Sequence, residues 1–199
     1  HDALPRSEER RVGKECMFHY VTREMSISHS FSFCLFAFVA WLTPRFLEHI
    51  SWKNALLMGG ALGWITLIRP TNAMLALFVL LFDVYSWNAL KDRVAALWGA
   101  RPKLLGAAAV AFLFFIPQML YWHEMTGSWL RYSYEGEDFI YWNKPKIADV
   151  LFDVQNGLLL YSPIVLFALI GMGMGWKQKR HHAPATTFIF ALATYTFAS

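Results

Sequence analysis

Cysteine and charged residues are both scarce in this 199-residue sequence. The chain has two cysteines, and 16% of its residues are charged, whereas soluble domains have about 25%. Two cysteines are too few for a small disulfide scaffold. A sequence that is 56% hydrophobic is also neither a disordered chain nor a collagen-like one.

Hydrophobic residues, by contrast, are abundant and occur in blocks. Aromatic residues make up 17% of the chain, and the mean hydropathy is +0.33. The 18 Lys and Arg against 14 Asp and Glu give a net charge of +4. These basic residues are scattered between the apolar blocks rather than clustered, so they indicate orientation in a membrane and not a nucleic-acid partner. The composition predicts an all-α, polytopic membrane protein.

The first 16 residues have a different character. Residues 6–16 read RSEERRVGKEC, which matches the direct translation of a common sequencing adapter, and the preceding HDALP resembles the opposite adapter strand in frame. We therefore expect residues 1–16 to be an adapter scar rather than a charged cytosolic tail, and we expect 17–199 to be a fragment of one transmembrane domain. Without Cys16, Cys34 stands alone in an apolar run. In that position Cys34 is expected to be a small hydrophobic core residue, and no disulfide or metal site remains.

Six apolar segments follow along the chain. They cover residues 26–42, 54–68, 73–87, 104–122 and 158–176, and the sixth begins near 184. A spanning helix needs about 20 apolar residues, so the fourth and fifth segments qualify outright. The second and third have 15 residues each and are joined by the short turn 69–72, which favours a helical hairpin with Pro70 in the first turn of its second helix. Gly59 and Gly63 are spaced to let a neighbouring helix approach closely.

The basic residues predict which loops face the cytoplasm. The loops 43–53, 88–103 and 177–183 hold nine Lys or Arg in 34 residues, whereas 17–25, 69–72 and 123–157 hold five in 48. Short basic loops stay inside, and these two groups of loops agree with strict alternation of the six segments. We therefore expect the long loop 123–157 to face outward.

The outer loop 123–157 is rich in carboxylates and aromatic rings. It holds six acidic residues and seven aromatic ones, among them Glu137 and Trp142. Aromatic faces beside carboxylates suit a sugar, whose C–H face stacks while its hydroxyls are hydrogen-bonded. An aromatic belt at the lipid headgroups and a plain solvated acidic loop account for the same residues.

Polar residues near the outer ends of the helices are further candidates. Arg69 lies at the end of the second segment, beside Asn72, at a depth where an unpaired cation is costly. A guanidinium there matches a phosphate bidentately, although a snorkelling Arg would occupy the same place. His29 lies near the outer start of the first segment, where an interfacial His with satisfied hydrogen bonds is the commoner explanation. Asp83, near the inner end of the third segment, is expected to pair with Lys91 or Arg93.

Three stretches in order carry a family resemblance. They are REMSISHSFSFCLFAFVAWL, GALGWITLIRPTN, and the long stretch from IPQMLYWHEM through EGEDFIYWNKPKIADVLFDVQNG to ALIGM. Over most of residues 20–176 the chain resembles bacterial integral-membrane glycosyltransferases of the GT-C superfamily, the group similar to dolichyl-phosphate-mannose protein mannosyltransferases. This resemblance implies transfer of a sugar from a polyprenyl-phosphate donor to a glycan, lipid or protein acceptor on the extracytoplasmic side.

The resemblance also suggests which residues contact the substrates. Arg69, Pro70 and Asn72 of the RPTN turn, His29, and Glu137 with Trp142 become candidate donor or acceptor contacts. The family's catalytic acid lies in the first outer loop, which we expect upstream of this fragment, so no residue here is assigned as catalytic and the fragment is expected to be inactive alone. No cofactor is evident from the sequence.

Two other classes of protein stay open. A secondary transporter also has short, proline-interrupted helices, but it carries ionisable residues near mid-bilayer, where these segments are almost wholly apolar. A non-catalytic scaffold of envelope glycan assembly needs no acidic constellation. A paired-acid motif in the upstream outer loop would distinguish the transferase from both.

Overall fold

A computed structural model describes residues 29–130, 142, 144–154, 157–162 and 164–198 of the chain. Every regular element in these ranges is a helix, and none of the described residues lies in a strand. The expectation of an all-α fold is therefore confirmed. Residues 1–28, which include the expected adapter scar, lie outside the described ranges.

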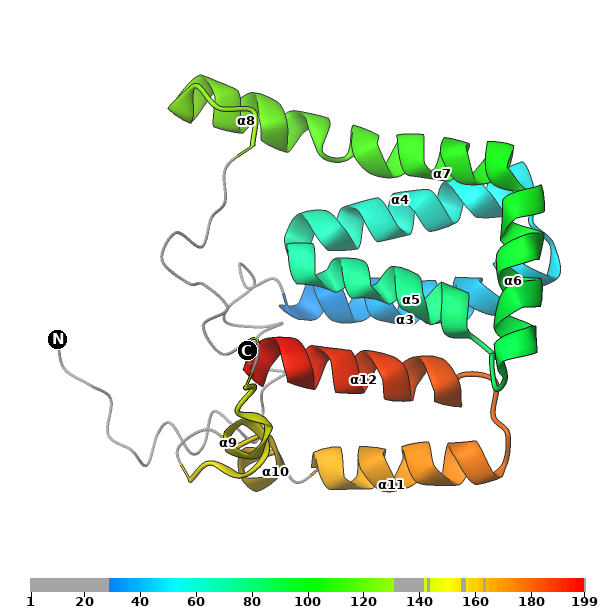
Figure 1. The fold of residues 1–199 in the computed structure, drawn as a ribbon. Coiled ribbons are helices and arrows are strands. Elements are labelled where there is room, and N and C mark those ends of the chain that lie inside the picture. The colour runs from blue at the N-terminus through cyan, green and yellow to red at the C-terminus, as the bar shows by residue number, and fades with distance from the viewer. Residues whose placement is uncertain (1–28, 131–141, 143, 155–156, 163, 199) are drawn as a thin grey trace, which may run out of the picture.

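The longer helices lie side by side and alternate in direction (Figure 1). One helix, α6, runs across one end of the others (Figure 1). The elements in chain order are α3 His29–Glu48, α4 Trp52–Ile68, the 3-10 helix η1 Pro70–Met74, α5 Leu75–Leu81, α6 Trp87–Gly99, α7 Arg101–Leu113, α8 Ile116–Thr126, α9 Ile147–Phe152, α10 Leu158–Tyr161, α11 Ile164–Lys177 and α12 Ala183–Ala198.

Local sequence signals set several of these boundaries. Ser51 and Ser86 accept hydrogen bonds from the backbone N–H three residues later, which satisfies donors at the starts of α4 and α6. Pro102 lies in the first turn of α7, where its missing N–H has no cost. At the other end of the α7–α8 segment, Gly127 takes the left-handed conformation with φ 74° and ends α8.

The observed helices follow the six predicted apolar segments, with four differences. The first helix, α3, continues to Glu48, six residues beyond the predicted end of the first segment at 42. The third segment stops being helical at Leu81, six residues earlier than expected. The fourth is interrupted at 114–115 between α7 and α8, and the fifth is divided into α10 and α11. Residues 88–103, which we expected to form a loop, instead form α6 and the start of α7.

Two helices are long and apolar enough to cross a membrane. They are Phe31–Glu48 and the stretch Arg101–Thr126, in which α8 follows α7 after the turn at 114–115. Three further apolar helices are shorter. At 1.5 Å per residue the 20 residues of α3 span about 30 Å, the thickness of a hydrocarbon core.

The outward faces of the helices are apolar as well as the inward ones. On α3 the buried positions include Val39, Leu42 and Phe46, while Phe33 and Trp41 on other faces are more than half exposed. Cys34 also lies on an exposed face, so its prediction as a core residue is wrong. A helix at the surface of a water-soluble protein has a polar outer face, so this pattern indicates a lipid environment.

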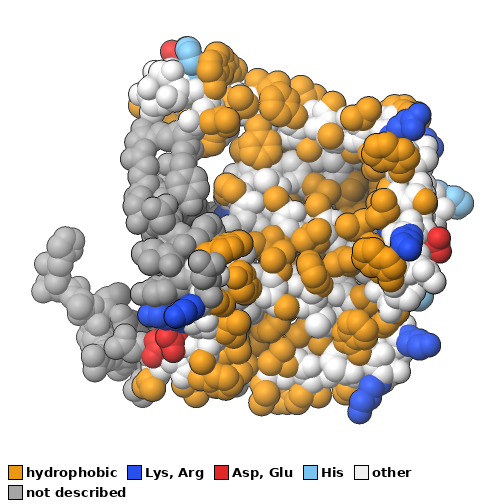
Figure 2. Space-filling model, in the orientation of Figure 1, with side chains coloured by type: hydrophobic (Ala, Val, Ile, Leu, Met, Phe, Trp, Pro, Cys, Tyr) orange, Lys and Arg blue, Asp and Glu red, His pale blue; other side chains and the backbone are white. Residues whose placement is uncertain are grey.

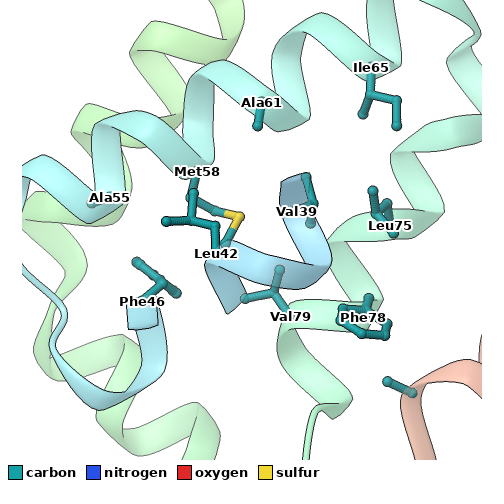
Figure 3. Packing of buried hydrophobic residues seen from close by; sticks show 11 residues of the cluster. Val39, Leu42, Phe46, Ala55, Met58, Ala61, Ile65, Leu75, Phe78 and Val79 are labelled. Carbon is teal, nitrogen blue, oxygen red and sulfur yellow. The ribbon is translucent and has the colours of Figure 1, made fainter. Parts of the chain in front are cut away.

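The core lies where α3, α4 and α5 meet. Leu42 of α3 and Met58 of α4 point toward one another, and Val79 of α5 lies beside them (Figure 3). Ile65 is fully buried near the other end of α4, and Ala185 brings α12 onto the same cluster. These contacts fix the position of α4 on its α3 side.

On its other side α4 packs against α7 through small residues. A Cβ atom on Gly63 would lie 2.6 Å from the Cα atom of Ala111, and one on Gly59 would overlap the backbone of Ala107. Only glycine at both positions allows the two backbones to approach this closely. The predicted close approach at Gly59 and Gly63 is confirmed.

Charge separates toward the ends of the bundle. On the face shown in Figure 2, the visible Lys and Arg side chains of the described residues lie at the two ends, with a hydrophobic band between them. We call these the Arg69 end, which carries the 69–72 turn, and the α6 end, which carries α6 and the turn before α12 (Figure 1).

Candidate functional site

The turn between α4 and α5 is held by three hydrogen bonds. The backbone N–H of Arg69 donates to the carbonyl of Ile65 over 3.3 Å, and the side-chain Nδ2 of Asn72 donates to the same oxygen over 3.1 Å. The backbone N–H of Asn72 also donates to the carbonyl of Arg69 over 2.9 Å. Asn72 therefore closes the C-terminal end of α4, which orients the turn.

Arg69 itself is extended, with φ −148° and ψ 123°, and its side chain is exposed. Among the residues that the structure describes, none is recorded as a hydrogen-bond or ion-pair partner of its guanidinium. The turn thus presents a cation at the end of an apolar helix while its backbone is fixed. This geometry suits an anion that approaches from the membrane surface.

The described part of the outer loop contacts the C-terminal helix. The hydroxyl of Tyr195 in α12 donates to the carbonyl of Trp142 over 2.6 Å, and the two rings meet edge to face at 5.5 Å. The N–H of Lys146 donates to the carbonyl of Ala198 over 2.9 Å. Trp142 keeps about half of its surface exposed.

The remaining predicted site residues are described only in part. His29 is the first residue of α3, which begins at the Arg69 end (Figure 1), and nothing of its side chain is described. Glu137 lies outside the described residues. The structure therefore brings the Arg69 turn, the start of α3 and Trp142 to one end of the bundle. Their contacts with a substrate stay predictions.

One buried polar atom lies near the start of α3. Ser32 is 9% exposed, and its hydroxyl has no hydrogen-bond partner among the described residues. Buried polar groups are normally paired, so this hydroxyl is an exception among them.

A polar cluster at the α6 end was not predicted in this form. Asp83 has the left-handed φ of 62°; its carboxylate pairs with Nδ1 of His181 at 3.0 Å, and its N–H donates to the carbonyl of His181. Asp83 therefore pairs with His181 and not, as expected, with Lys91 or Arg93. Arg93 donates to the carbonyl of Phe82 over 3.0 Å, and His181 stacks on the Phe82 ring. The cluster ties α5 and α6 to the turn before α12.

Two pKa values depart from their usual range in this cluster. Burial lowers the pKa of Arg93, and the nearby Asp83 carboxylate opposes that change. Burial raises the pKa of Tyr85, and the negative charge of Asp83 adds a smaller increase. The Tyr85 hydroxyl donates to the carbonyl of Arg180 over 2.7 Å. The Asp83 carboxylate thus favours the charged form of Arg93 against the effect of burial, and the raised pKa of Tyr85 favours its neutral form.

Metal ligands are not gathered in the described residues, which hold no group of three or more His, Cys, Asp or Glu side chains that could bind an ion. Comparisons of the chain with protein-family models, with curated proteins and with solved structures gave no match.

Proposed function

We propose that this chain is part of a membrane glycosyltransferase that takes a sugar from a polyprenyl-phosphate donor and transfers it on the extracytoplasmic face. The observation that carries the proposal is the Arg69 turn, where a fixed backbone presents an exposed guanidinium at the end of an apolar helix. The order of the three sequence stretches that resemble GT-C enzymes supports the same function.

In this proposal all six apolar segments cross the bacterial inner membrane. The 69–72 turn and the 123–157 loop face outward, and the α6 end faces the cytoplasm. The higher density of Lys and Arg in the loops at the α6 end supports this orientation. The donor lipid then lies among the helices with its phosphate at the depth of Arg69.

Sugar transfer requires a base for the acceptor hydroxyl and a positive charge near the departing lipid phosphate. The acceptor oxygen attacks the anomeric carbon, the bond from that carbon to the phosphate oxygen breaks, and the lipid phosphate leaves with the electron pair. A carboxylate takes the acceptor proton. Arg69 stabilises the charge that develops on the departing phosphate, and Trp142 and Glu137 contact the sugar or the acceptor. The carboxylate base is not assigned to a described residue.

A secondary transporter is the main alternative from another class, and the described residues disfavour it. Their buried polar side chains are Ser32 and Thr43, and the Thr43 hydroxyl already donates to the carbonyl of Val39. Ion-coupled transport needs ionisable groups near mid-bilayer, and no Asp, Glu, Lys or Arg among the described residues is buried.

Binding of the lipid phosphate tests the proposal. The purified chain is placed in nanodiscs and titrated with undecaprenyl phosphate, as wild type, Arg69→Lys and Arg69→Ala. A charge-assisted hydrogen bond contributes about 1.5–3 kcal/mol, so Arg69→Ala should weaken binding by roughly tenfold to a hundredfold. Arg69→Lys should fall between, because it keeps the charge and loses the planar fork.

The control separates phosphate binding from general charge and from folding. Lys53→Ala removes an exposed cation at the α6 end and should bind as the wild type does. Equal affinity of the wild type and Arg69→Ala, at equal yields of folded protein, would exclude the phosphate role. A match between Arg69→Lys and the wild type would instead identify a snorkelling anchor.

A further inference from the structure

An apolar groove runs along α5, α6 and α7 at the α6 end. It consists of two adjoining hollows of about 280 and 420 Å³, and Figure 2 shows a hollow in the hydrophobic band beside α6. Leu80, Leu97, Leu104 and Ala108 line both of them. Ligand sites have volumes of about 300–1,000 Å³, so the space suits one flexible chain.

The floor of the groove is lined by small residues. Gly59, Ala107 and Ala111, which make the close contact between α4 and α7, also line the inner hollow. These short side chains leave the inner hollow, of about 280 Å³, open above them.

Among the described residues that line the groove, Arg101 alone is charged. Arg101 lies at the junction of α6 and α7, where the outer hollow opens, and its side chain is exposed. The neighbouring Lys103 already donates its ammonium to the carbonyl of Ile50. Arg101 is therefore placed to bind an anionic group whose apolar part enters the groove.

The surface of α6 has the pattern of a helix at a membrane interface. Trp87 is 69% exposed and Trp98 is 70% exposed, and the Lys91 ammonium lies 5.9 Å from the centre of the Trp87 ring. Indole rings and basic side chains together favour the headgroup layer of a bilayer. Since α6 crosses the helix ends, it places Arg101 at this depth (Figure 1).

We propose that this groove binds an anionic phospholipid, with one acyl chain along Leu80, Leu97, Leu104 and Ala108 and the phosphate at Arg101. Charge complementarity at the mouth, the apolar walls and the interfacial tryptophan Trp98 all fit this one occupant. The site lies at the opposite end of the bundle from Arg69. The proposal requires that the chain lies in a membrane, but it does not depend on sugar transfer.

Native mass spectrometry of the purified chain, titrated with phosphatidylglycerol or phosphatidylcholine, tests the proposal. The wild type should retain phosphatidylglycerol in preference to phosphatidylcholine. Arg101→Gln should weaken retention of phosphatidylglycerol about tenfold, and Ala108→Trp, which fills the groove, should abolish it although the charge remains. Lys177→Gln removes an exposed cation on α11, away from the groove, and should retain the lipid as the wild type does.

Three outcomes would overturn the proposal. Lipid retention that is equal in Ala108→Trp and the wild type, with helix content unchanged by circular dichroism, would show that the chain does not enter the groove. Displacement of the lipid by millimolar inorganic phosphate would indicate a site for a free anion. Loss of an oligomer in Ala108→Trp, without a change in lipid retention, would assign the groove to a second copy of this chain. If Ala108→Trp does not fold, Ala108→Leu provides the same test with a smaller side chain.

Discussion

The glycine pair in α4 provides a direct test of the α4–α7 contact. In Gly59→Ala the new Cβ atom would lie 2.7 Å from both the Cα and the carbonyl carbon of Ala107, where ordinary contacts begin near 3.4 Å. The carbonyl oxygen of Ala107 would be closer still, and the helices must separate because the obstructing atoms belong to the backbone and cannot rotate away. Overpacking of this kind costs about 1–3 kcal/mol.

Gly60 provides the matched control one residue along the same helix. A Cβ atom there would meet Phe114 and Val110 at 3.6 and 3.7 Å, which are ordinary contacts. Both substitutions gain the same helix propensity, up to about 1 kcal/mol, so this term cancels between the two variants. Gly59→Ala should therefore be less stable than Gly60→Ala by about 1–3 kcal/mol.

The free energy of unfolding is measured in mixed micelles by titration with sodium dodecyl sulfate, followed by far-ultraviolet circular dichroism. Gly63→Ala should behave like Gly59→Ala, because its Cβ atom would lie 2.6 Å from the backbone of Ala111. Equal stabilities of Gly59→Ala and Gly60→Ala would refute the packing of α4 on α7 described here.

Three further predictions concern the two ends of the bundle. Asn72→Ala removes the hydrogen bond that closes α4 and should lower the free energy of unfolding by about 0.5–1.5 kcal/mol in the same assay. Tyr85→Phe removes the hydrogen bond to Arg180 and should be destabilising at neutral pH. Because the fold raises the pKa of Tyr85, the neutral tyrosine stabilises the folded state fully below about pH 10 and loses this contribution at higher pH. The loss of stability in Tyr85→Phe, relative to the wild type, should therefore shrink as the pH rises above that value. A loss of stability that does not change with pH would contradict the assignment. In a cysteine-free background, Ser128→Cys should react with an impermeant thiol reagent in intact cells, whereas Gln178→Cys should react only after permeabilisation, and the reverse pattern would invert the proposed orientation.

The positions of the helices were largely predictable from the apolar runs. A run that is apolar on every face forms a helix whether it faces lipid or protein, so α3, α4, α7 and α12 appear where the sequence places them. Because all faces of such a helix are apolar, the sequence does not indicate which face is buried against other helices. For that reason Cys34 was assigned to the core although its side chain is exposed.

The helix α6 was missed for a different reason. Residues 88–103 were interpreted by their charge, as a basic loop. The apolar positions Leu90, Val94 and Leu97 recur every three or four residues between Trp87 and Trp98, and this spacing is the signal that predicts an amphipathic helix. The early end of α5 left no such signal, because it depends on the contact between Asp83 and the distant turn before α12.

The position of the candidate site was predictable from the sequence, but the role of each residue within it was not. The sequence places Arg69 at the end of an apolar helix, and the structure has it there, exposed. Nothing in the sequence distinguishes Asn72 as a ligand contact from Asn72 as the residue that closes α4. The side-chain hydrogen bond back to Ile65 depends on the path of the 3-10 helix that follows, which residue types do not specify.

The two small-residue contacts and the Arg69 turn belong to one rigid helix. Gly59 and Gly63 set how closely α4 lies against α7, and the last turn of α4 carries Arg69 about 15 Å beyond Gly59. The opposite face of α4 is buried against α3 and α5, whereas α7 has no buried residue, so a change in the α4–α7 distance displaces α7 rather than α4. The turn is tied to Ile65 of α4 through Asn72. The placement of the proposed phosphate contact therefore depends on the contacts of α4 with α3 and α5 and on the residues of the turn, and not on the glycines that face α7.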